Sequence, residues 1–359
     1  MKILHVNLEM HWGGGEKQLI QLIEESSLES VLICIRSSKL HEYCLAKQLP
    51  HYCMSSRSPY NIQSISGFIK ASKQYKPDII HLHTSKAHTL GVIAGWFYQS
   101  PPLVVTRRMS TPLKDNFFSK YKYNHSGVKK IICVSQAVKN VVSRKVDKQK
   151  LATIYGGINI SQTEERINRN FLATRYPQLV GKRVIGFVGS LTDVKDPLLF
   201  IEVAARISQR LPDAAFIMIG EGELKDDLLN RVNQLNLTKA VHFTGFIEAS
   251  VAAISSLDLL LITSKNEGIP NVILEAFVTK TPVVAVDVGG IPELIQNDKT
   301  GKLSSREPEE LAKQAIEVLT NSDLSEMLAE NAYDKALEFN YQKGIDHTLR
   351  LYEEILSKN

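Results

Sequence analysis

Two carboxylates eight positions apart, Glu267 and Glu275, have a spacing that could serve chemistry in this 359-residue chain. Apolar residues recur at helical spacing from Val272, which predicts a helix that begins near Asn271 and carries Glu275. Eight residues of helix advance roughly 12 Å, so the two carboxylates could contact both ends of one ligand. A diphosphate flanked by hydroxyl-bearing groups, as in a nucleotide-sugar, is such a ligand. Alternatively, Glu275 is solvated and Glu267 interacts only with the helix dipole.

Two predicted buried strands position these carboxylates. The apolar runs 257–262 and 282–286 indicate strands of a parallel sheet, one before the loop of Glu267 and one after the helix. Open α/β sheets bind ligands beyond the carboxyl ends of their strands. The helix N-terminus near Asn271 would offer N–H groups to an anion at the same place.

A second strand, loop and helix start lies at residues 184–197. The strand 184–189 is followed by a polar loop, and Pro197 is favourable in the first turn of a helix. Lys195 precedes this helix directly, where its ammonium group could neutralise a diphosphate. The alternative is a solvated lysine without a ligand.

Residues 267–275 match the pattern E-G-x-P-x-x-x-x-E, and Gly289-Gly290-Ile291-Pro292-Glu293 follows it. In these residues the chain resembles the retaining glycosyltransferases of family 4. The resemblance implies an α/β GT-B fold, in which two doubly wound Rossmann-like domains face each other across a cleft. It also implies that Glu267 contacts the donor sugar and Glu275 the ribose hydroxyls, while Lys195 binds the diphosphate. Glu267 and Lys195 are the candidate catalytic residues.

The expected donor site includes residues from four segments. The family's first loop reads G-G-x-E, as residues 13–16 do here, and the residues after Gly245 occupy the place where the family holds the nucleobase. Ser190 stands where the family has an arginine. The candidate donor-binding residues are Gly14, Gly15, Lys195, Ile247, Glu267, Gly268, Ile269, Asn271 and Glu275.

The first half of the chain is strongly basic. Residues 1–160 carry a net charge of +13, from 22 Lys and Arg against 9 Asp and Glu, whereas the whole chain carries +5. This asymmetry indicates an anionic partner. No recognised nucleic-acid-binding motif accompanies the charge. We therefore expect a glycolipid or lipid-linked oligosaccharide acceptor of the bacterial lipopolysaccharide-core or surface-polysaccharide kind, and no nucleic acid.

The candidate acceptor-side residues follow predicted strands of this basic half; they are His83, Lys86, Arg107 and Arg108. A satisfied core histidine is the alternative for His83. Many family members also place a histidine near residues 107–108, and this chain has none there. Residues 112–130 mix aromatic side chains with five lysines, which is typical of a segment on an anionic membrane leaflet. Alternatively, its aromatics pack on the domain core.

A metal or other cofactor is not expected. The chain contains no Asp-x-Asp sequence, and His41, Cys44, His51 and Cys53 match no common zinc spacing. UDP is the expected nucleotide, since it is frequent in the family. Two other functions share the architecture: a nucleotide-sugar 2-epimerase, and a non-catalytic carbohydrate-binding subunit.

The predicted domains are residues 1–165, joined by a C-terminal helix 341–359, and residues 180–340. The polar stretch 161–183 between them reads as a linker. The first residues lack the long apolar core of a signal peptide, and no apolar run approaches the ~18 residues of a membrane span. We therefore expect a cytoplasmic protein that can associate peripherally with the inner face of the membrane.

Overall fold

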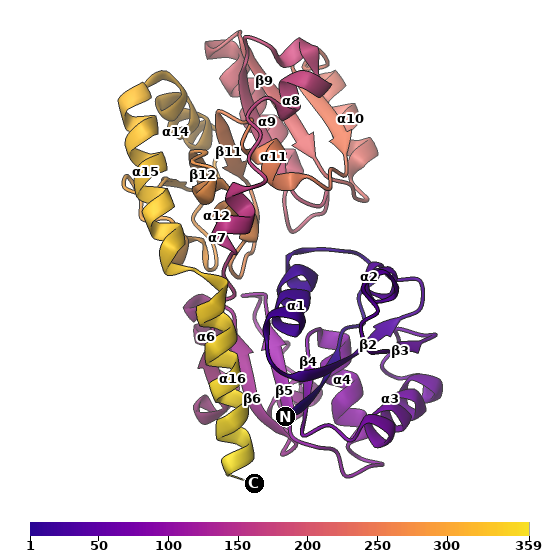
Figure 1. The fold of residues 1–359 in the computed structure, drawn as a ribbon. Helices are drawn as coiled ribbons and strands as arrows, with labels where there is room; N and C mark the ends of the chain where they lie inside the picture. Colours follow the sequence, from indigo (N-terminus) through magenta and orange to yellow (C-terminus); the bar gives the residue numbers. More distant parts are fainter. Residues whose placement is uncertain (359) are drawn as a thin grey trace. The chain divides into compact units, whose positions relative to one another are not determined.

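The computed structural model describes residues 1–358, which form two compact units (Figure 1). The first unit is Met1–Gly156 together with the chain from Gln342 onward, and the second is Gly157–Tyr341. Both units are built on parallel sheets covered by helices, as the GT-B prediction requires.

The first unit contains a seven-stranded sheet in the order β3-β2-β1-β4-β5-β6-β7. Neighbouring strands in it all run parallel. Its strands are β1 (Lys2–Val6), β2 (Glu29–Ile35), β3 (His51–Met54), β4 (Ile79–Leu82), β5 (Leu103–Arg107), β6 (Val128–Cys133) and β7 (Leu151–Thr153). Its helices are α1 (Gly14–Glu25), α2 (Lys39–Lys47), α3 (Ile62–Tyr75), α4 (Ser85–Ala94), α5 (Phe117–Asn124), α6 (Gln136–Val142), the 3-10 turn η1 (Lys148–Lys150) and α16 (Tyr341–Ser357).

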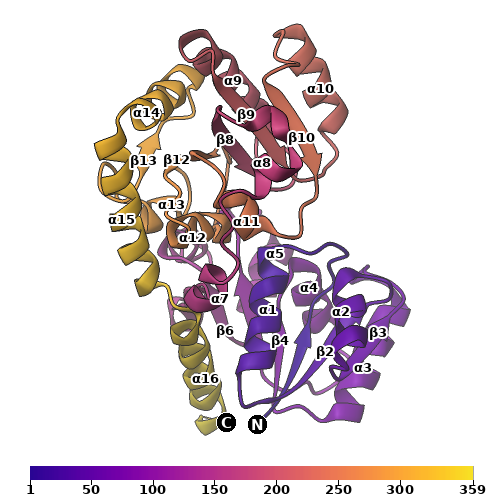
Figure 2. The same cartoon turned by 45° about the horizontal axis from the view of Figure 1, so that its top comes forward.

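The second unit contains a six-stranded parallel sheet in the order β10-β9-β8-β11-β12-β13. Within it, α9 packs between α10 and α14 (Figure 2). Its strands are β8 (Arg183–Val188), β9 (Ala214–Ile219), β10 (Val241–Gly245), β11 (Leu259–Ile262), β12 (Val283–Val286) and β13 (Lys302–Ser304). Its helices are α7 (Ile160–Glu164), α8 (Phe171–Arg175), the 3-10 turn η2 (Pro177–Leu179), α9 (Pro197–Arg210), α10 (Lys225–Gln234), α11 (Ser250–Ile254), α12 (Asn271–Val278), α13 (Ile291–Leu294), α14 (Pro308–Thr320) and α15 (Ser322–Glu338).

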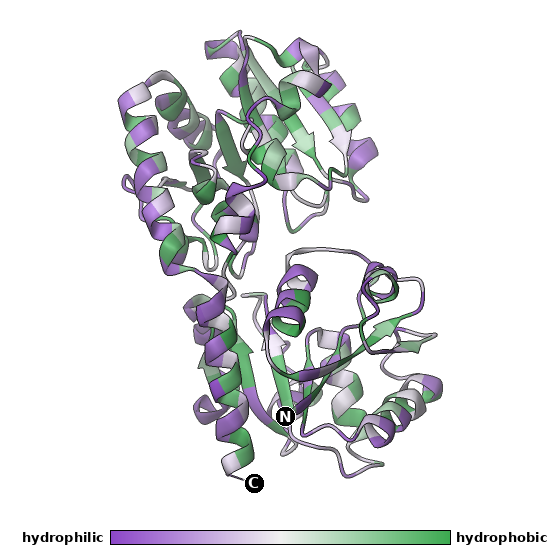
Figure 3. Ribbon diagram, viewed as in Figure 1, coloured by the Kyte–Doolittle hydropathy of each residue, from purple (hydrophilic) through white to green (hydrophobic). Residues whose placement is uncertain are grey.

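Apolar strands form the interior of each unit, and the helices turn their polar faces outward (Figure 3). The last helix completes the first unit. Tyr352 and Ile355 of α16 are buried against Ile3 of β1 and Ile79 of β4. The predicted apolar stripe of this helix is therefore its buried face, which ties the end of the chain to the first sheet.

The stretch 161–183, read from the sequence as a linker, is folded onto the second unit. Although the stretch is mostly polar, its two side chains Leu172 and Leu179 are buried and attach it to the unit. The backbone N–H of Asn168 donates to the Ser255 hydroxyl over 3.0 Å. The units therefore divide at Gly156/Gly157 and not in the expected range between 165 and 180.

No helix in residues 1–358 combines the length and the apolar character that crossing a bilayer requires.

Candidate functional site

The site in the second unit lies where the strand order of the sheet reverses. β8 and β11 are neighbours, paired through Ile185 and Leu259, but the chain continues from β8 to β9 on one side and from β11 to β12 on the other. Such a switch point leaves room for a ligand between the two loops that leave the strands. Lys195 lies in the loop after β8 and Glu267 in the loop after β11.

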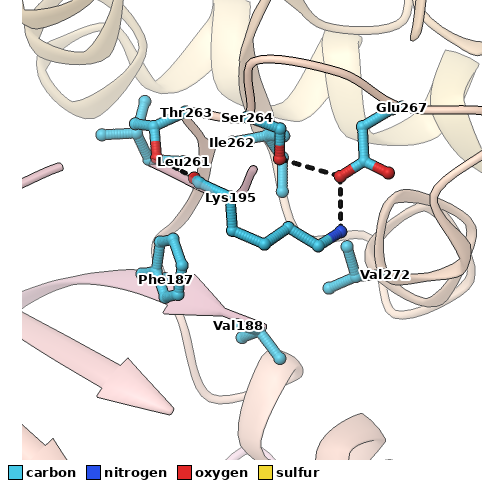
Figure 4. A pocket seen from close by; sticks show the side chains of 9 residues that line it. All are labelled: Phe187, Val188, Lys195, Leu261, Ile262, Thr263, Ser264, Glu267 and Val272. Carbon is cyan, nitrogen blue, oxygen red and sulfur yellow. Dashed lines mark hydrogen bonds and ion pairs between the residues drawn. The ribbon is translucent and has the colours of Figure 1, made fainter. Parts of the chain in front are cut away.

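Lys195 and Glu267 form an ion pair at this point. Lys195 Nζ lies 2.5 Å from Glu267 Oε1, and the Ser264 hydroxyl donates to the same oxygen over 2.8 Å. Figure 4 shows the lysine extending across from its own loop to meet the carboxylate. The Glu267 side chain is 9% exposed and that of Lys195 29%. The structure thus joins the two residues that the sequence named as catalytic candidates.

The backbone around Lys195 is held by the neighbouring strand. The Thr263 hydroxyl, at the end of β11, donates to the carbonyl oxygens of Lys195 (3.1 Å) and Asp196 (2.9 Å). The Asp196 carboxylate in turn pairs with Arg306. These contacts fix the direction in which the lysine leaves its loop, just before Pro197 begins α9.

A small pocket adjoins the ion pair. Its walls are largely apolar, and it lies beside the first turn of α12, which begins at Asn271 as predicted. The lining residues are Phe187, Val188, Lys195, Leu261, Ile262, Thr263, Ser264, Glu267 and Val272 (Figure 4). A cation and a helix N-terminus favour an anion here, and a carboxylate beside them can accept hydrogen bonds from sugar hydroxyls.

The remaining donor-site candidates of the second unit lie outside this pocket lining. Gly268 and Ile269 are buried in the loop before α12, and Asn271 is half-buried. Glu275 is buried within α12, so it is not the solvated helix residue that was the alternative. Ile247 is buried after β10, at the edge of the sheet. Sequence reasoning missed Ser264, whose only signal is its position three residues before Glu267.

The first unit has its own switch point, between β1 and β4. Gly14 and Gly15 begin α1 after β1, and His83 follows β4. Arg108 joins these loops, because its guanidinium donates to the carbonyl oxygens of His83 (2.7 Å) and Gly15 (3.3 Å). Burial lowers the pKa of Arg108, although Glu16 partly offsets this effect. Arg108, an acceptor-side candidate from the sequence, therefore connects the loop of Gly15 with the loop of His83.

The ring of His83 belongs to a buried histidine cluster. His83 Nε2 lies 3.0 Å from Nδ1 of His5, while His81 contacts the Tyr352 hydroxyl over 2.5 Å and the Thr106 hydroxyl over 2.6 Å. Burial lowers the pKa of all three histidines, to about 3 for His5. This location corresponds to the core-histidine alternative more closely than to an acceptor contact.

Arg107 and Lys86 lie elsewhere in the first unit. Arg107 ends β5 and donates to the Tyr123 hydroxyl over 2.7 Å and to the Thr111 carbonyl over 2.5 Å. Lys86 is half-buried in the first turn of α4. Lys122 of α5 approaches the same Tyr123 ring as Arg107; the sequence included it only within 112–130.

Among residues 1–358, two groups of histidine and cysteine side chains lie close enough together to suggest a metal: His5 with His81 and His83, and His41 with His51 and Cys53. In the first group, His5 Nδ1 and His83 Nε2 lie 3.0 Å apart, and His83 Nδ1 has no hydrogen-bond partner among the described residues. In the second, His41 Nδ1 accepts from the Ser37 N–H.

Comparisons with known proteins place this geometry in context. The model of the family "Glycosyl transferases group 1" matches residues 171–335, and that of "Glycosyltransferase Family 4" matches residues 12–162. An Escherichia coli protein named UDP-Gal:alpha-D-GlcNAc-diphosphoundecaprenol alpha-1,3-galactosyltransferase is 26% identical over 99% of this chain and 97% of its own length. A Bacillus anthracis N-acetyl-alpha-D-glucosaminyl L-malate synthase is 24% identical, over 85% of this chain and 82% of its own.

Solved structures share the fold over the full length. The crystal structure of Anabaena HepE in complex with UDP-glucose superposes with a TM-score of 0.85 at 22% identity, covering 100% of both chains. A glycosyltransferase from Rickettsia africae ESF-5 superposes with a TM-score of 0.83 at 20% identity, covering 100% of this chain and 99% of its own.

Proposed function

Because the chain belongs to family 4 of the glycosyltransferases and has the GT-B fold, we propose that it transfers a hexose from a UDP-linked donor to a lipid-linked saccharide. The Lys195–Glu267 ion pair at the switch point of the second unit carries this proposal. It combines a cation for the leaving diphosphate with a carboxylate for the transferred sugar.

Charge stabilisation is the proposed source of catalysis. As the bond between the anomeric carbon and the leaving phosphate oxygen breaks, negative charge grows on the diphosphate. Lys195 and the N-terminus of α12 are fixed before the reaction, so they stabilise that charge without reorganising. No step requires a divalent cation, and the configuration of the anomeric carbon is retained, as in the family that the sequence resembles.

Glu267 and Glu275 have separate proposed roles. Glu267, held by Lys195 and Ser264, accepts hydrogen bonds from hydroxyls of the donor sugar. Glu275, one turn into α12, binds the ribose hydroxyls, and Ile247 with its neighbours holds the nucleobase. UDP is supported by the similar structures of Anabaena HepE, which were solved in complex with UDP and with UDP-glucose.

The acceptor proposal is supported by charge and by a relative's name. Residues 1–160, nearly all of which belong to the first unit, carry a net charge of +13, while the rest of the chain is net negative. The Escherichia coli relative acts, by its name, on a diphosphoundecaprenol-linked sugar. An anionic lipid-linked acceptor suits both observations, and the enzyme would then work at the inner surface of the cytoplasmic membrane.

A donor and acceptor panel tests the proposal. The protein is incubated with UDP-glucose, UDP-galactose and UDP-N-acetylglucosamine, with and without bacterial lipid extract, and UDP release and glycolipid products are measured. We expect glycolipid product only when donor and lipid are both present, unchanged by EDTA, and lost in Lys195→Met. Free sugar without lipid would instead identify a 2-epimerase, and UDP-sugar binding without any product would identify a non-catalytic subunit.

A further inference from the structure

Two cations of the first unit flank a single aromatic ring. The Arg107 guanidinium carbon lies 5.6 Å from the centroid of Tyr123, and Lys122 Nζ lies 5.2 Å from it. Arg107 ends β5 and Lys122 belongs to α5, so the pair is assembled from two elements. Tyr123 is itself buried, which keeps both cations against a fixed surface.

No carboxylate neutralises this pair. Among residues 1–358, neither Arg107 nor Lys122 takes part in an ion pair with Asp or Glu, although Lys120 two positions earlier pairs with Asp115. Burial, and next the charge of Arg107, lower the pKa of Lys122 to about 8. Holding two partly desolvated cations close together costs free energy through lost hydration and mutual repulsion. An anionic ligand between them would offset that cost.

The surrounding groups are suited to phosphoryl oxygens. Lys122 Nζ lies 3.3 Å from the hydroxyls of Ser85 and Thr89, which are placed by the first turns of α4. The buried Nε of Arg107 has no hydrogen-bond partner among the described residues. Ammonium, guanidinium and hydroxyl groups thus come together from three elements. The Lys122 ammonium and the Ser85 hydroxyl can donate to a phosphate, and the Arg107 guanidinium adds positive charge beside them, while the Thr89 hydroxyl donates to the Ser85 carbonyl.

An exposed aromatic cluster, composed of Trp96, Phe117, Phe118 and Tyr121, adjoins this pair. Phe117 and Phe118 are 74% and 77% exposed. The Trp96 indole N–H donates to the Tyr121 hydroxyl over 3.1 Å, which joins the segment after α4 to α5. Tyr121 directly precedes Lys122, so one short helix turns aromatic rings to solvent and its ammonium group toward Arg107.

We propose that Arg107 and Lys122, with Ser85, bind a phosphoryl group of a lipid-diphosphate acceptor, and that the aromatic cluster contacts the hydrocarbon chain attached to it. This inference rests on the proposed transfer to a lipid-linked saccharide and specifies which end of the acceptor the first unit holds. It names Arg107 rather than Arg108, because Arg107 shares the ring of Tyr123 with Lys122, whereas Arg108 donates to the carbonyl oxygens of His83 and Gly15.

Geranyl diphosphate is a suitable probe, since it carries both chemical groups and stays soluble. Its binding is measured by calorimetry on the full chain with saturating UDP, so that the donor site of the second unit cannot take up the diphosphate. Lys122→Gln is expected to weaken binding about 10- to 100-fold, because a charge-assisted contact is lost. Lys120→Gln, the matched lysine on the same helix, should stay within about twofold.

Substitutions in the aromatic cluster test the proposed contact with the hydrocarbon chain. Phe117→Ser combined with Phe118→Ser should weaken geranyl diphosphate about tenfold or more while leaving inorganic diphosphate unaffected. Tyr60→Ser, which removes another exposed aromatic ring of the first unit, should change neither. Binding of inorganic diphosphate as tight as that of geranyl diphosphate would identify a phosphate site without a lipid contact and overturn the proposal.

Steady-state kinetics of sugar transfer distinguish a failure of this inference from a failure of the proposed function. Lys122→Gln should raise the KM for the lipid acceptor with little change in kcat or in the KM for the UDP-sugar. Geranyl diphosphate binding unaltered by Lys122→Gln would refute the site even if the enzyme transfers sugar to lipid. Conversely, absence of UDP binding would contradict the proposed function. The effect of Lys122→Gln on geranyl diphosphate binding would still be measurable, because that measurement does not depend on sugar transfer.

Discussion

Replacing Lys195 by methionine separates its electrostatic role from its packing role. Methionine keeps much of the aliphatic stem that lines the pocket beside Phe187 and Val188, but removes the charge that faces Glu267 over 2.5 Å. Loss of one preorganised group that stabilises developing charge costs about 10²–10³-fold in kcat. We therefore expect kcat/KM for the UDP-sugar to fall by that factor, equivalent to about 2.7–4 kcal/mol of transition-state stabilisation.

The same substitution should lower stability by a smaller amount. Breaking a fully buried ion pair costs about 3–5 kcal/mol, but the Lys195 side chain is 29% exposed, and Ser264 still donates to Glu267. Solvent screening reduces the expected cost to about 1–2 kcal/mol. For a domain the size of the second unit this corresponds to a fall in Tm of about 2–8 °C, measurable by scanning calorimetry.

The double variant Lys195→Met with Glu267→Gln gives the decisive comparison. It should regain most of the lost thermal stability, because no unpaired buried carboxylate remains. Turnover should be no higher than in the single variant, since the cation for the diphosphate is still missing and the carboxylate proposed to contact the donor sugar is lost as well. If Lys195→Met retained activity within about threefold, or if the double variant recovered turnover together with stability, the assignment of Lys195 to the leaving group would be wrong.

Three further outcomes are expected. Transfer should persist at full rate after EDTA treatment and dialysis, and loss of activity that manganese restores would contradict the charge-based mechanism. The free energy of unfolding, followed by urea titration, should fall as pH drops below about 6.5, because His5 and His81 have depressed pKa values in the folded protein and take up protons mainly when unfolded; a flat profile between pH 7 and 5 would argue against the buried cluster. Gly220→Ala should destabilise strongly, by several kcal/mol, because its φ is +145° and a Cβ atom there would lie 1.9 Å from the Gly189 carbonyl oxygen. Gly181→Ala, also at positive φ but with open space around it, should cost only about 1 kcal/mol, so equal effects of the two substitutions would refute the steric explanation.

Local signals predicted much of the second unit correctly. The helix expected near Asn271 begins at that residue, and Lys195 lies just before the helix that begins at Pro197. Both positions follow from neighbouring residues, through apolar periodicity and the preference of proline for the first helical turn. The family resemblance and the GT-B fold are likewise confirmed by the comparisons.

Features that depend on distant parts of the chain could not be read from such signals. Lys195 and Glu267 are 72 positions apart, and their contact depends on β8 lying beside β11. Trp96 joins Tyr121 from another segment, so the sequence reading of 112–130 omitted it. Polar composition suggested a linker around Leu172, because two buried side chains are too few to produce a periodic pattern.

The path of the chain has a consequence for biosynthesis. The first sheet is covered by Tyr352 and Ile355, which are synthesised after the whole second unit, Gly157 to Tyr341. The apolar surface around Ile3 and Ile79 therefore stays uncovered in the nascent protein until α16 has been made, while the second unit can already fold. Chaperone dependence and sensitivity to C-terminal truncation should consequently concentrate in the part of the protein that is made first.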